Sequence, residues 1–138
     1  MAVQGGLLRM DTPGNGHIVD LTDGVVRVVS TSGVERGLVT VFASGSTVAV
    51  TTMEYEPGGV HDLQQLLDRL VPSDADYEHN VRNHDTNAHA HLRAAVIGPS
   101  ETIPLVDGRL ALGTWQQVVL LDFDDRPRRR TVTVQVLS

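Results

Sequence analysis

The chain has 138 residues, a formal net charge of −6 and no cysteine, and all eleven of its Lys and Arg positions are arginine. Without cysteine it has no thiolate zinc site, disulfide or thiol nucleophile, and without lysine it has no Schiff-base or P-loop chemistry. The acidic charge argues against nucleic-acid binding, and no apolar run approaches the ~20 residues of a membrane helix. We therefore expect a soluble, cytoplasmic protein that binds neither nucleic acid nor membranes.

The N-terminal part is predicted to contain a hairpin and then a helix. Leu7–Met10 and His17–Leu21 flank the turn sequence Pro13-Gly14-Asn15-Gly16, which predicts a hairpin. In the next segment four β-branched valines between residues 25 and 29 favour a strand, but their spacing places them on one face of a helix. Thr22 as a possible N-cap and Gly33 as a stop favour the helix.

The middle of the chain is predicted to contain two strands and the clearest helix. Residues 38–43 and 47–52 read as strands joined around Ser44-Gly45-Ser46. After the break at Pro57, apolar residues recur at helical spacing over residues 60–70 and end before a second proline. Residues 73–91 have few apolar side chains, so we expect a long polar loop there.

The remainder of the chain is predicted to be β-structure. Val118–Leu121 is apolar on both faces, so its strand should be central, and Asp107-Gly108 is a hairpin turn signal. About seven antiparallel strands and two main helices predict an α+β fold, a β-sandwich-like single domain over residues 1–138. The candidate strands in this part cover residues 92–97, 102–106, 109–112, 117–123 and 131–137.

Histidines gather in the polar segment, where four of the six lie within residues 79–91. His89-Ala90-His91 is an H-x-H pair at the mouth of a predicted strand, where side chains two residues apart point to the same face. Two imidazoles on one face with a third from a loop are a common way to bind zinc or a similar ion. A solvated loop with hydrogen-bonding histidines is the alternative.

Three other features are candidate functional positions, each with an ordinary structural alternative. Glu54 follows a predicted strand, where loop residues often act, but it also suits the entry of a helix. Trp115 is the only tryptophan, and a single tryptophan ordinarily belongs to the core. Residues 126–130 carry four arginines close to three aspartates between residues 122 and 125, which predicts either an internally paired turn or an anion clamp. No G-x-G-x-x-G, P-loop, G-x-S-x-G or H-E-x-x-H motif is present.

Several segments together resemble one family, the YjbQ-like proteins. The resemblance rests above all on Asp85-Thr86-Asn87-Ala88-His89-Ala90-His91 and Leu112-Gly113-Thr114-Trp115-Gln116, with further segments at 54–58, 77–79, 97–100, 103–110 and 123–130. It implies a β-sandwich-like α+β fold, a homotrimer, and the label commonly given to the family, secondary thiamine-phosphate synthase. That reaction couples a pyrimidine diphosphate to a thiazole phosphate with loss of pyrophosphate. The physiological role of the family is regarded as unsettled.

The resemblance also assigns site residues. The family's polar pocket positions are matched by His79, His91, Glu54, Asn87 and Trp115. The chain departs from the family pattern in two places: Gly45-Ser46-Thr47 replaces the His-Thr-Thr of many members, and His89 replaces an aspartate. Exchange of one imidazole for another would keep three nitrogens near one ion, which is our hypothesis for this chain.

These residues support an enzymatic hypothesis with a small phosphorylated substrate. His79, His89 and His91 would bind a divalent metal ion, zinc or magnesium, or else the substrate's phosphates. Arg93, which shares a face with the H-x-H pair on a regular strand, or Arg128 would neutralise the leaving pyrophosphate. Glu54 would orient the substrate or a metal-bound water. The predicted catalytic residues are thus Glu54 and Arg93, and the predicted substrate-binding residues are Ser46, Thr47, Asn87, Trp115 and Arg128.

Two other hypotheses stay open. The first is a non-catalytic oligomer that binds a metal or a small molecule in a pocket between subunits. The second is a purely structural oligomer, which would leave the polar segment of residues 73–91 unexplained.

Overall fold

Two antiparallel sheets form the framework of the computed structural model, which describes residues 1–138. The larger sheet has the strand order β1-β8-β3-β5-β6 and the smaller sheet the order β2-β7-β4. This arrangement confirms the predicted α+β class, with four helices where two main ones were predicted. In chain order the elements are β1 (Val3–Thr12), β2 (His17–Asp20), α1 (Thr22–Ser32), β3 (Gly37–Ala43), β4 (Val48–Met53), α2 (Pro57–Leu70), α3 (Glu78–Asn83), α4 (Ala88–Ile97), β5 (Ser100–Val106), β6 (Arg109–Leu110), β7 (Gln117–Asp122) and β8 (Arg128–Leu137).

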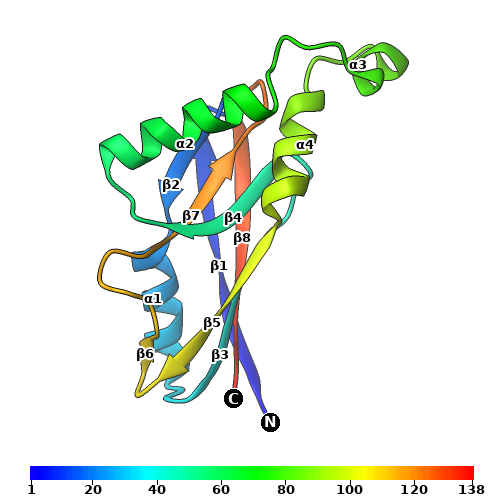
Figure 1. Cartoon of the computed structure of the whole chain (residues 1–138). Helices are drawn as coiled ribbons and strands as arrows, with labels where there is room; N and C mark the ends of the chain where they lie inside the picture. Colours follow the sequence, from blue (N-terminus) through cyan, green and yellow to red (C-terminus); the bar gives the residue numbers. More distant parts are fainter.

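Strand β7 lies at the centre of the molecule because both of its faces are buried. Val118 and Leu120 point into the core between the two sheets. Val119 and Leu121 point into a second core, to which helices α2 and α4 contribute Leu67, Ala90 and Ala94. The smaller sheet is therefore the middle of three layers, with α2 and α4 on its outer side (Figure 1). The prediction of a central strand at Val118–Leu121 is confirmed.

Helix α1 forms where the valine spacing predicts it. Val25 and Val29 are buried in the core between the sheets. The helix ends at Gly33, whose φ of 69° lies in the left-handed region that glycine adopts without strain. The expected N-cap is wrong, since Leu21 occupies that position. Thr22 instead accepts a hydrogen bond from a backbone N–H of strand β7 through its hydroxyl oxygen.

Helix α2 confirms the apolar stripe of residues 60–70 and begins three residues earlier, at Pro57. The carboxylate of Glu56 accepts hydrogen bonds from the N–H groups of Gly58 and Gly59, so it caps the first turn. None of the four helices is both long and apolar enough to cross a bilayer.

The predicted N-terminal hairpin is wrong, although its turn is present. Gly14, Asn15 and Gly16 have φ values of 73°, 55° and 83°, as residues of tight turns do. The two flanking strands belong to different sheets, because β1 pairs with β8 and β2 pairs with β7. The turn signal correctly indicates where the chain reverses, but it does not indicate which strands pair. Here the turn carries the chain from the larger sheet to the smaller one.

The region of residues 73–97 departs furthest from the prediction. Helices α3 and α4 stand where a long loop and a strand at 92–97 were expected. Residues 88–97 contain four alanines, which are strong helix formers, and Ala88, Ala90 and Ala94 are buried. On a helix, His89 and His91 lie about 200° apart around the axis, so they do not share a face.

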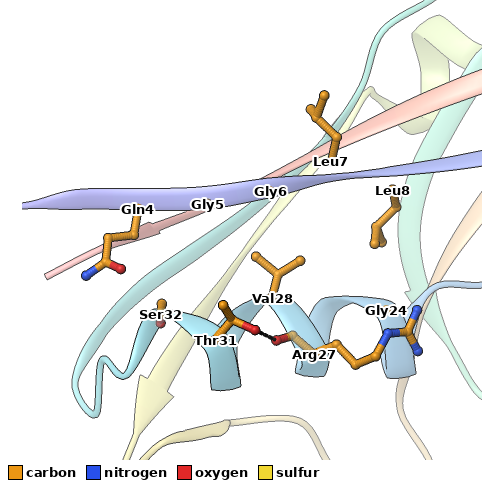
Figure 2. A pocket seen from close by; sticks show the side chains of 10 residues that line it. All are labelled: Gln4, Gly5, Gly6, Leu7, Leu8, Gly24, Arg27, Val28, Thr31 and Ser32. Atoms are coloured by element: carbon orange, nitrogen blue, oxygen red, sulfur yellow. Dashed lines mark hydrogen bonds between the residues drawn. The ribbon is translucent and has the colours of Figure 1, made fainter.

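Helix α1 lies beside β1, which is an edge strand of the larger sheet (Figure 2). Two glycines allow the close approach: a Cβ at Gly6 would lie 3.2 Å from Val28, and a Cβ at Gly24 would lie 2.8 Å from Leu8. A groove of about 360 Å³ runs between the strand and the helix, with Arg27 in its lining.

The two ends of the chain lie side by side. Ala2 and Ser138 exchange backbone hydrogen bonds of 3.4 and 3.1 Å, which continue the ladder between β1 and β8. Strand β8 lies between β1 and β3, so the last strand of the chain fills the interior of the larger sheet.

Candidate functional site

Two of the three predicted histidine ligands meet where α3 and α4 come together. The rings of His79 on α3 and His91 on α4 are in edge contact, with 4.7 Å between ring centroids and 60° between ring planes. His91 Nδ1 lies 3.1 Å from the carbonyl oxygen of Ser46, so Nδ1 carries a proton and donates it. Nε2 of His91 is thereby left free for a ligand. We call His79, His91 and Asn87 the histidine site.

The histidine site adjoins the amino end of α4. Asn87 is the N-cap residue, yet its side chain makes no capping hydrogen bond. Its amide nitrogen instead lies 3.2 Å from His79 Nε2 and 3.2 Å from a carboxylate oxygen of Asp85, and it donates to both. Asn80 caps the helix in its place, because its Oδ1 accepts from the Ala88 N–H at 3.0 Å. The positive end of the helix dipole therefore lies beside the two imidazoles.

His89 lies outside this site. Its side chain is buried, and its Nδ1 has no hydrogen-bond partner. Burial lowers the pKa of His89 below the ordinary value of 6.5, and the charge of Arg93 lowers it further, against the opposing carboxylates of Asp125, Asp124 and Asp68. The expectation that His89 and His91 share a face is wrong because residues 88–97 are helical.

The residues present do not fit the expected zinc or magnesium centre within one chain. Only His79 and His91 come together, and no three His, Asp or Glu side chains are placed to hold one ion. The hypothesis that His89 supplies a third nitrogen ligand to the same ion fails, because His89 lies outside the histidine site. A metal centre of this protein would need further ligands from outside the chain.

The loop between β3 and β4 accounts for the glycine at position 45. Gly45 has a φ of 148°, and a Cβ there would lie 3.0 Å from Arg130 Nη1 and 3.0 Å from Val48. A side chain at this position would therefore crowd the guanidinium of Arg130. Ser46 is exposed and touches the histidine site through its carbonyl group. Thr47 is buried and bonded to Asp124 and Arg130, so its hydroxyl is already used.

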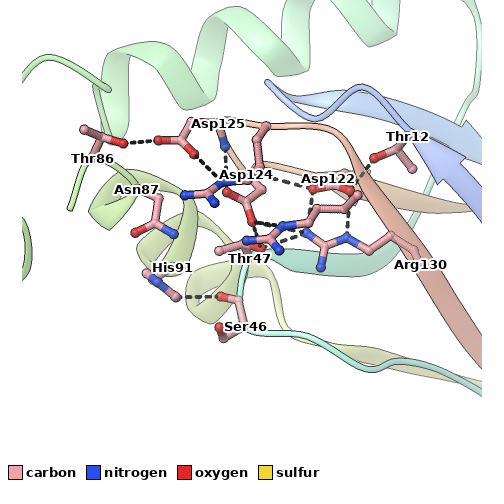
Figure 3. A network of polar contacts seen from close by, with 12 residues as sticks. Thr12, Ser46, Thr47, Thr86, Asn87, His91, Asp122, Asp124, Asp125 and Arg130 are labelled. Carbon is pink, nitrogen blue, oxygen red and sulfur yellow. Dashed lines mark hydrogen bonds and ion pairs between the residues drawn. The ribbon is translucent and has the colours of Figure 1, made fainter.

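A buried network of ion pairs lies behind the histidine site (Figure 3). Arg130 donates from Nε and Nη2 to both carboxylate oxygens of Asp122, at 2.7 and 2.8 Å. Arg128 donates from Nε to Asp124 at 2.8 Å. Of the two alternatives for residues 126–130, internal pairing is the one that the structure shows. Asp122 and Arg130 were not among the predicted site residues, although the clustering of acidic residues and arginines in the sequence was a visible signal.

Further hydrogen bonds join the network to the histidine site. Thr47 bonds to Asp124 at 3.1 Å and directly follows Ser46, whose carbonyl group holds His91. Thr86 bonds to Asp125 and directly precedes Asn87 (Figure 3). The positions of His91 and Asn87 therefore depend on the paired turn between β7 and β8.

The carboxyl group of Asp124 has the clearest change in acidity. Burial by itself would raise its pKa, but hydrogen bonds from Arg128, the Asp125 N–H and Thr47 outweigh this effect and lower the pKa from 3.8 to about 2. A carboxyl group whose pKa is lower in the folded chain stabilises the fold above its ordinary pKa. That contribution disappears as the pH falls from about 4 towards 2.

Replacing Asp124 with asparagine should therefore lower the free energy of unfolding by about 2 kcal/mol at pH 7. Between pH 4 and 2 the difference from the natural chain should shrink towards zero, because the natural carboxyl group is then protonated too. Urea unfolding at several pH values measures both effects. Asp11→Asn is the matched control, because Asp11 is 85% exposed and lies 3.9 Å from Arg129. A constant difference from pH 7 to pH 2 would contradict the argument.

The predicted catalytic residues lie away from the histidine site. Arg93 is buried and donates to the Val71 carbonyl at 2.9 and 2.7 Å and to Asp68 at 3.1 Å. It follows His89 by four residues on α4, so it shares a face with His89 and not with His91. Glu54 follows the end of β4 that lies away from Ser46, and both Glu54 and Trp115 are exposed. Eight residues of chain separate Ser46 from Glu54, a span of at most roughly 25 Å.

The two sheets and their helical cover are shared with solved structures of small α+β proteins. A hypothetical protein from Aeropyrum pernix K1 superposes with a TM-score of 0.91 at 36% identity and covers 100% of this chain and 99% of its own. A YbjQ-like protein of unknown function from Sulfolobus solfataricus P2 gives 0.89 at 29% identity, with 99% of each chain covered.

The family model described as UPF0047 protein YjbQ-like matches residues 7–138. The chain belongs to this family. A UPF0047 protein of Archaeoglobus fulgidus is 39% identical over 130 residues, which are 94% of this chain and 98% of the relative. One of Mycobacterium tuberculosis H37Rv is 41% identical over 114 residues, 82% of this chain and 84% of the relative.

Proposed function

We propose that the protein binds a phosphorylated small molecule at the histidine site. The observation that carries this proposal is the contact of His79 and His91 beside the amino end of α4. Protonated imidazoles donate charge-assisted hydrogen bonds to phosphate oxygens, and a helix amino end favours the same anions. His91 suits this role as an imidazolium, because Nδ1–H donates to the Ser46 carbonyl and Nε2–H is then left to donate to a phosphate oxygen.

Arg128 is the arginine that we include in the phosphate site. Its side chain is 42% exposed, and only its Nε is hydrogen-bonded, to Asp124. The terminal guanidinium nitrogens are left for a phosphate group. The guanidinium of Arg93, in contrast, is buried and donates to Val71 and Asp68, so we assign it a structural role.

The reaction that we propose is the one implied by the family resemblance, synthesis of thiamine phosphate. The thiazole nitrogen forms a bond to the methylene carbon of the pyrimidine diphosphate, and the carbon–oxygen bond to the diphosphate breaks. Pyrophosphate leaves with the bonding electron pair. In this proposal the His91 imidazole, Arg128 and the amino end of α4 stabilise the charge that develops on the leaving group, while His79 packs against the His91 ring. No step uses a metal ion, since the three histidines do not converge.

A binding protein without catalysis is the second candidate. It is favoured by the positions of Glu54 and Arg93, because the histidine site of one chain lacks both predicted catalytic side chains. In either case we propose a homotrimer in solution. Light scattering measures the molar mass of the assembly directly. A mass of one chain would contradict it.

The test begins with inorganic pyrophosphate, titrated into the protein by calorimetry after treatment with EDTA. We expect saturable binding that survives the chelator. Incubation with the pyrimidine diphosphate and the thiazole phosphate should then release pyrophosphate and form thiamine phosphate. Binding without product would favour the second candidate. Binding that EDTA abolishes and zinc restores would show that the site needs a metal, and no binding under either condition would overturn the proposal.

A further inference from the structure

A polar cavity of about 160 Å³ lies between helix α2, helix α4 and the turn that leads into β2. The turn and the second half of α2 contribute Asn15, Gln64 and Asp68 to its lining. Arg93 of α4 and Phe123, which follows β7, also line it. None of these residues belongs to the histidine site. The volume is enough for several ordered waters or for one small molecule.

Arg93 brings to this cavity a hydrogen-bond donor that the protein does not use. Its side chain is only 7% exposed, and its Nε and Nη2 groups donate to the Val71 carbonyl and to Asp68. Nη1 donates to no protein atom. Among the buried side-chain atoms without a partner, only His89 Nδ1 is closed to solvent, so Nη1 of Arg93 opens to the cavity that Arg93 lines. Buried donors are ordinarily paired, and this one is available to a molecule in the cavity.

A carboxylate adjoins this donor. Asp68 accepts from Arg93 Nη2 through Oδ1 at 3.1 Å, whereas its Oδ2 has no partner in the protein. The Asp68 side chain is 59% exposed, so the carboxylate lies at the mouth of the cavity and the buried guanidinium lies deeper. Gln64, one helical turn before Asp68, donates from Nε2 to the Gly16 carbonyl at 2.9 Å, which leaves its Oε1 to accept a hydrogen bond. The cavity thus presents one cationic donor beside one anionic acceptor.

These paired charges favour a ligand that carries both signs. Arg93 attracts a simple anion but Asp68 repels it, and for a simple cation the two effects are reversed. Arg93 and Asp68 are in direct contact, so they match a carboxylate and an ammonium group that a single carbon joins. In this arrangement the ligand carboxylate accepts from Arg93 Nη1, and the ligand ammonium donates to Asp68 Oδ2 and Gln64 Oε1.

The rest of the lining limits what else the ligand can carry. Ile18, Leu67 and Phe123 are buried and form the apolar part of the wall. The other polar side chains, Asn15 and Gln65, end in neutral amides. A further charged group on the ligand would therefore have no partner of opposite charge, and burial without such a partner is costly. A small uncharged side chain suits this wall.

We propose that this cavity binds a small zwitterionic α-amino acid, with Arg93 and Asp68 as its two charged contacts. The bound molecule bridges α2 and α4, the two helices that Arg93 already joins through Val71 and Asp68. The cavity and the histidine site have no residue in common, so this proposal does not rest on the proposed function.

Nuclear magnetic resonance on the isotopically labelled natural chain tests the proposal, with glycine as the probe. Glycine should shift the signals of the Arg93 Nε–H and of the backbone N–H groups of Gly16 and Gln64, and the shifts should saturate. Acetate and methylamine each carry one of the two charges and should bind at least about tenfold more weakly. Three results would each overturn the proposal: no saturable shift with glycine, shifts that gather at the histidine site instead, or acetate that binds as tightly as glycine.

Asp68→Asn tests the part played by the paired charges. Asparagine retains an acceptor for Arg93 but removes the negative charge at the mouth of the cavity. Glycine should therefore bind at least about tenfold more weakly than to the natural chain, and acetate should bind more tightly. Asp62→Asn, exposed on the same helix and outside the cavity, is the matched control and should change neither affinity. Unchanged glycine binding by Asp68→Asn would contradict the role of Asp68, and the comparison of glycine with acetate on the natural chain holds whether or not this variant folds.

Discussion

Replacing Arg130 with methionine should lower the free energy of unfolding by about 3 to 5 kcal/mol. Methionine retains much of the apolar length of the arginine side chain but removes both hydrogen bonds to Asp122. Asp122 is fully buried, so its carboxylate would be left without a cation and without access to water. Removal of one partner of a buried ion pair is costly for this reason. Urea unfolding at pH 7 measures the loss.

The adjacent residue provides the matched control. Arg129 lies on the same strand, its side chain is 76% exposed, and its ion pair with Asp11 is 3.9 Å long. Arg129→Met should change the free energy of unfolding by less than about 0.5 kcal/mol. A second variant, Arg130→Met with Asp122→Asn, should recover part of the loss because no buried charge then lacks a partner. Equal losses from Arg130→Met and Arg129→Met would contradict the importance of the buried network.

His91→Ala should weaken pyrophosphate binding at least about tenfold, because a charge-assisted hydrogen bond contributes roughly 1.5 to 3 kcal/mol. The fold should be little affected, since the His91 side chain is only half-buried and its one hydrogen bond ends on the Ser46 carbonyl. Calorimetry measures the binding, and urea unfolding measures the stability of the same variant.

His61→Ala is the control for this variant, because His61 is exposed on α2 and belongs to no site described above. It should bind pyrophosphate as the natural chain does. A large loss of stability in His91→Ala with unchanged binding would make His91 a structural histidine and would remove the basis of the proposed function.

Elements whose signals are local could be predicted from the sequence. The valine spacing before Gly33, the apolar stripe of residues 60–70 and the two-faced apolar run at Val118–Leu121 all describe a single element and its own burial. The Asp107-Gly108 turn is of the same kind, with φ values of 50° and 74° at its two residues. Each of these predictions is confirmed.

Features that depend on residues far apart in the sequence could not be predicted. The pairing of β1 with β8 joins residues more than a hundred positions apart, and no turn signal can indicate it. Residues 88–97 were misread because their alternating small and polar residues suit an edge strand as well as a helix. Helix α4 forms because its alanines fill the space over β4, which is a property of the packed molecule.

The candidate site was predictable only in part, for a related reason. The density of histidines correctly marked the region of His79 and His91. The predicted strand then placed the side chains of His89 and Arg93 on the same face as His91. On the helix that forms instead, residues two apart point to different faces. The role of Arg130 and Asp124 in holding Thr47, which directly follows Ser46, could not be foreseen, since it requires the β3–β4 loop to meet β8 and the β7–β8 loop.

The place of β8 also has a consequence for synthesis. β8 leaves the ribosome after β1 to β7, yet it belongs between β1 and β3. Until it arrives, the nascent chain must keep two long strands with open edges, which are the surfaces most prone to pair with other chains. The larger sheet, and with it Arg130 and the loops that it holds, can therefore be completed only after the last strand has emerged.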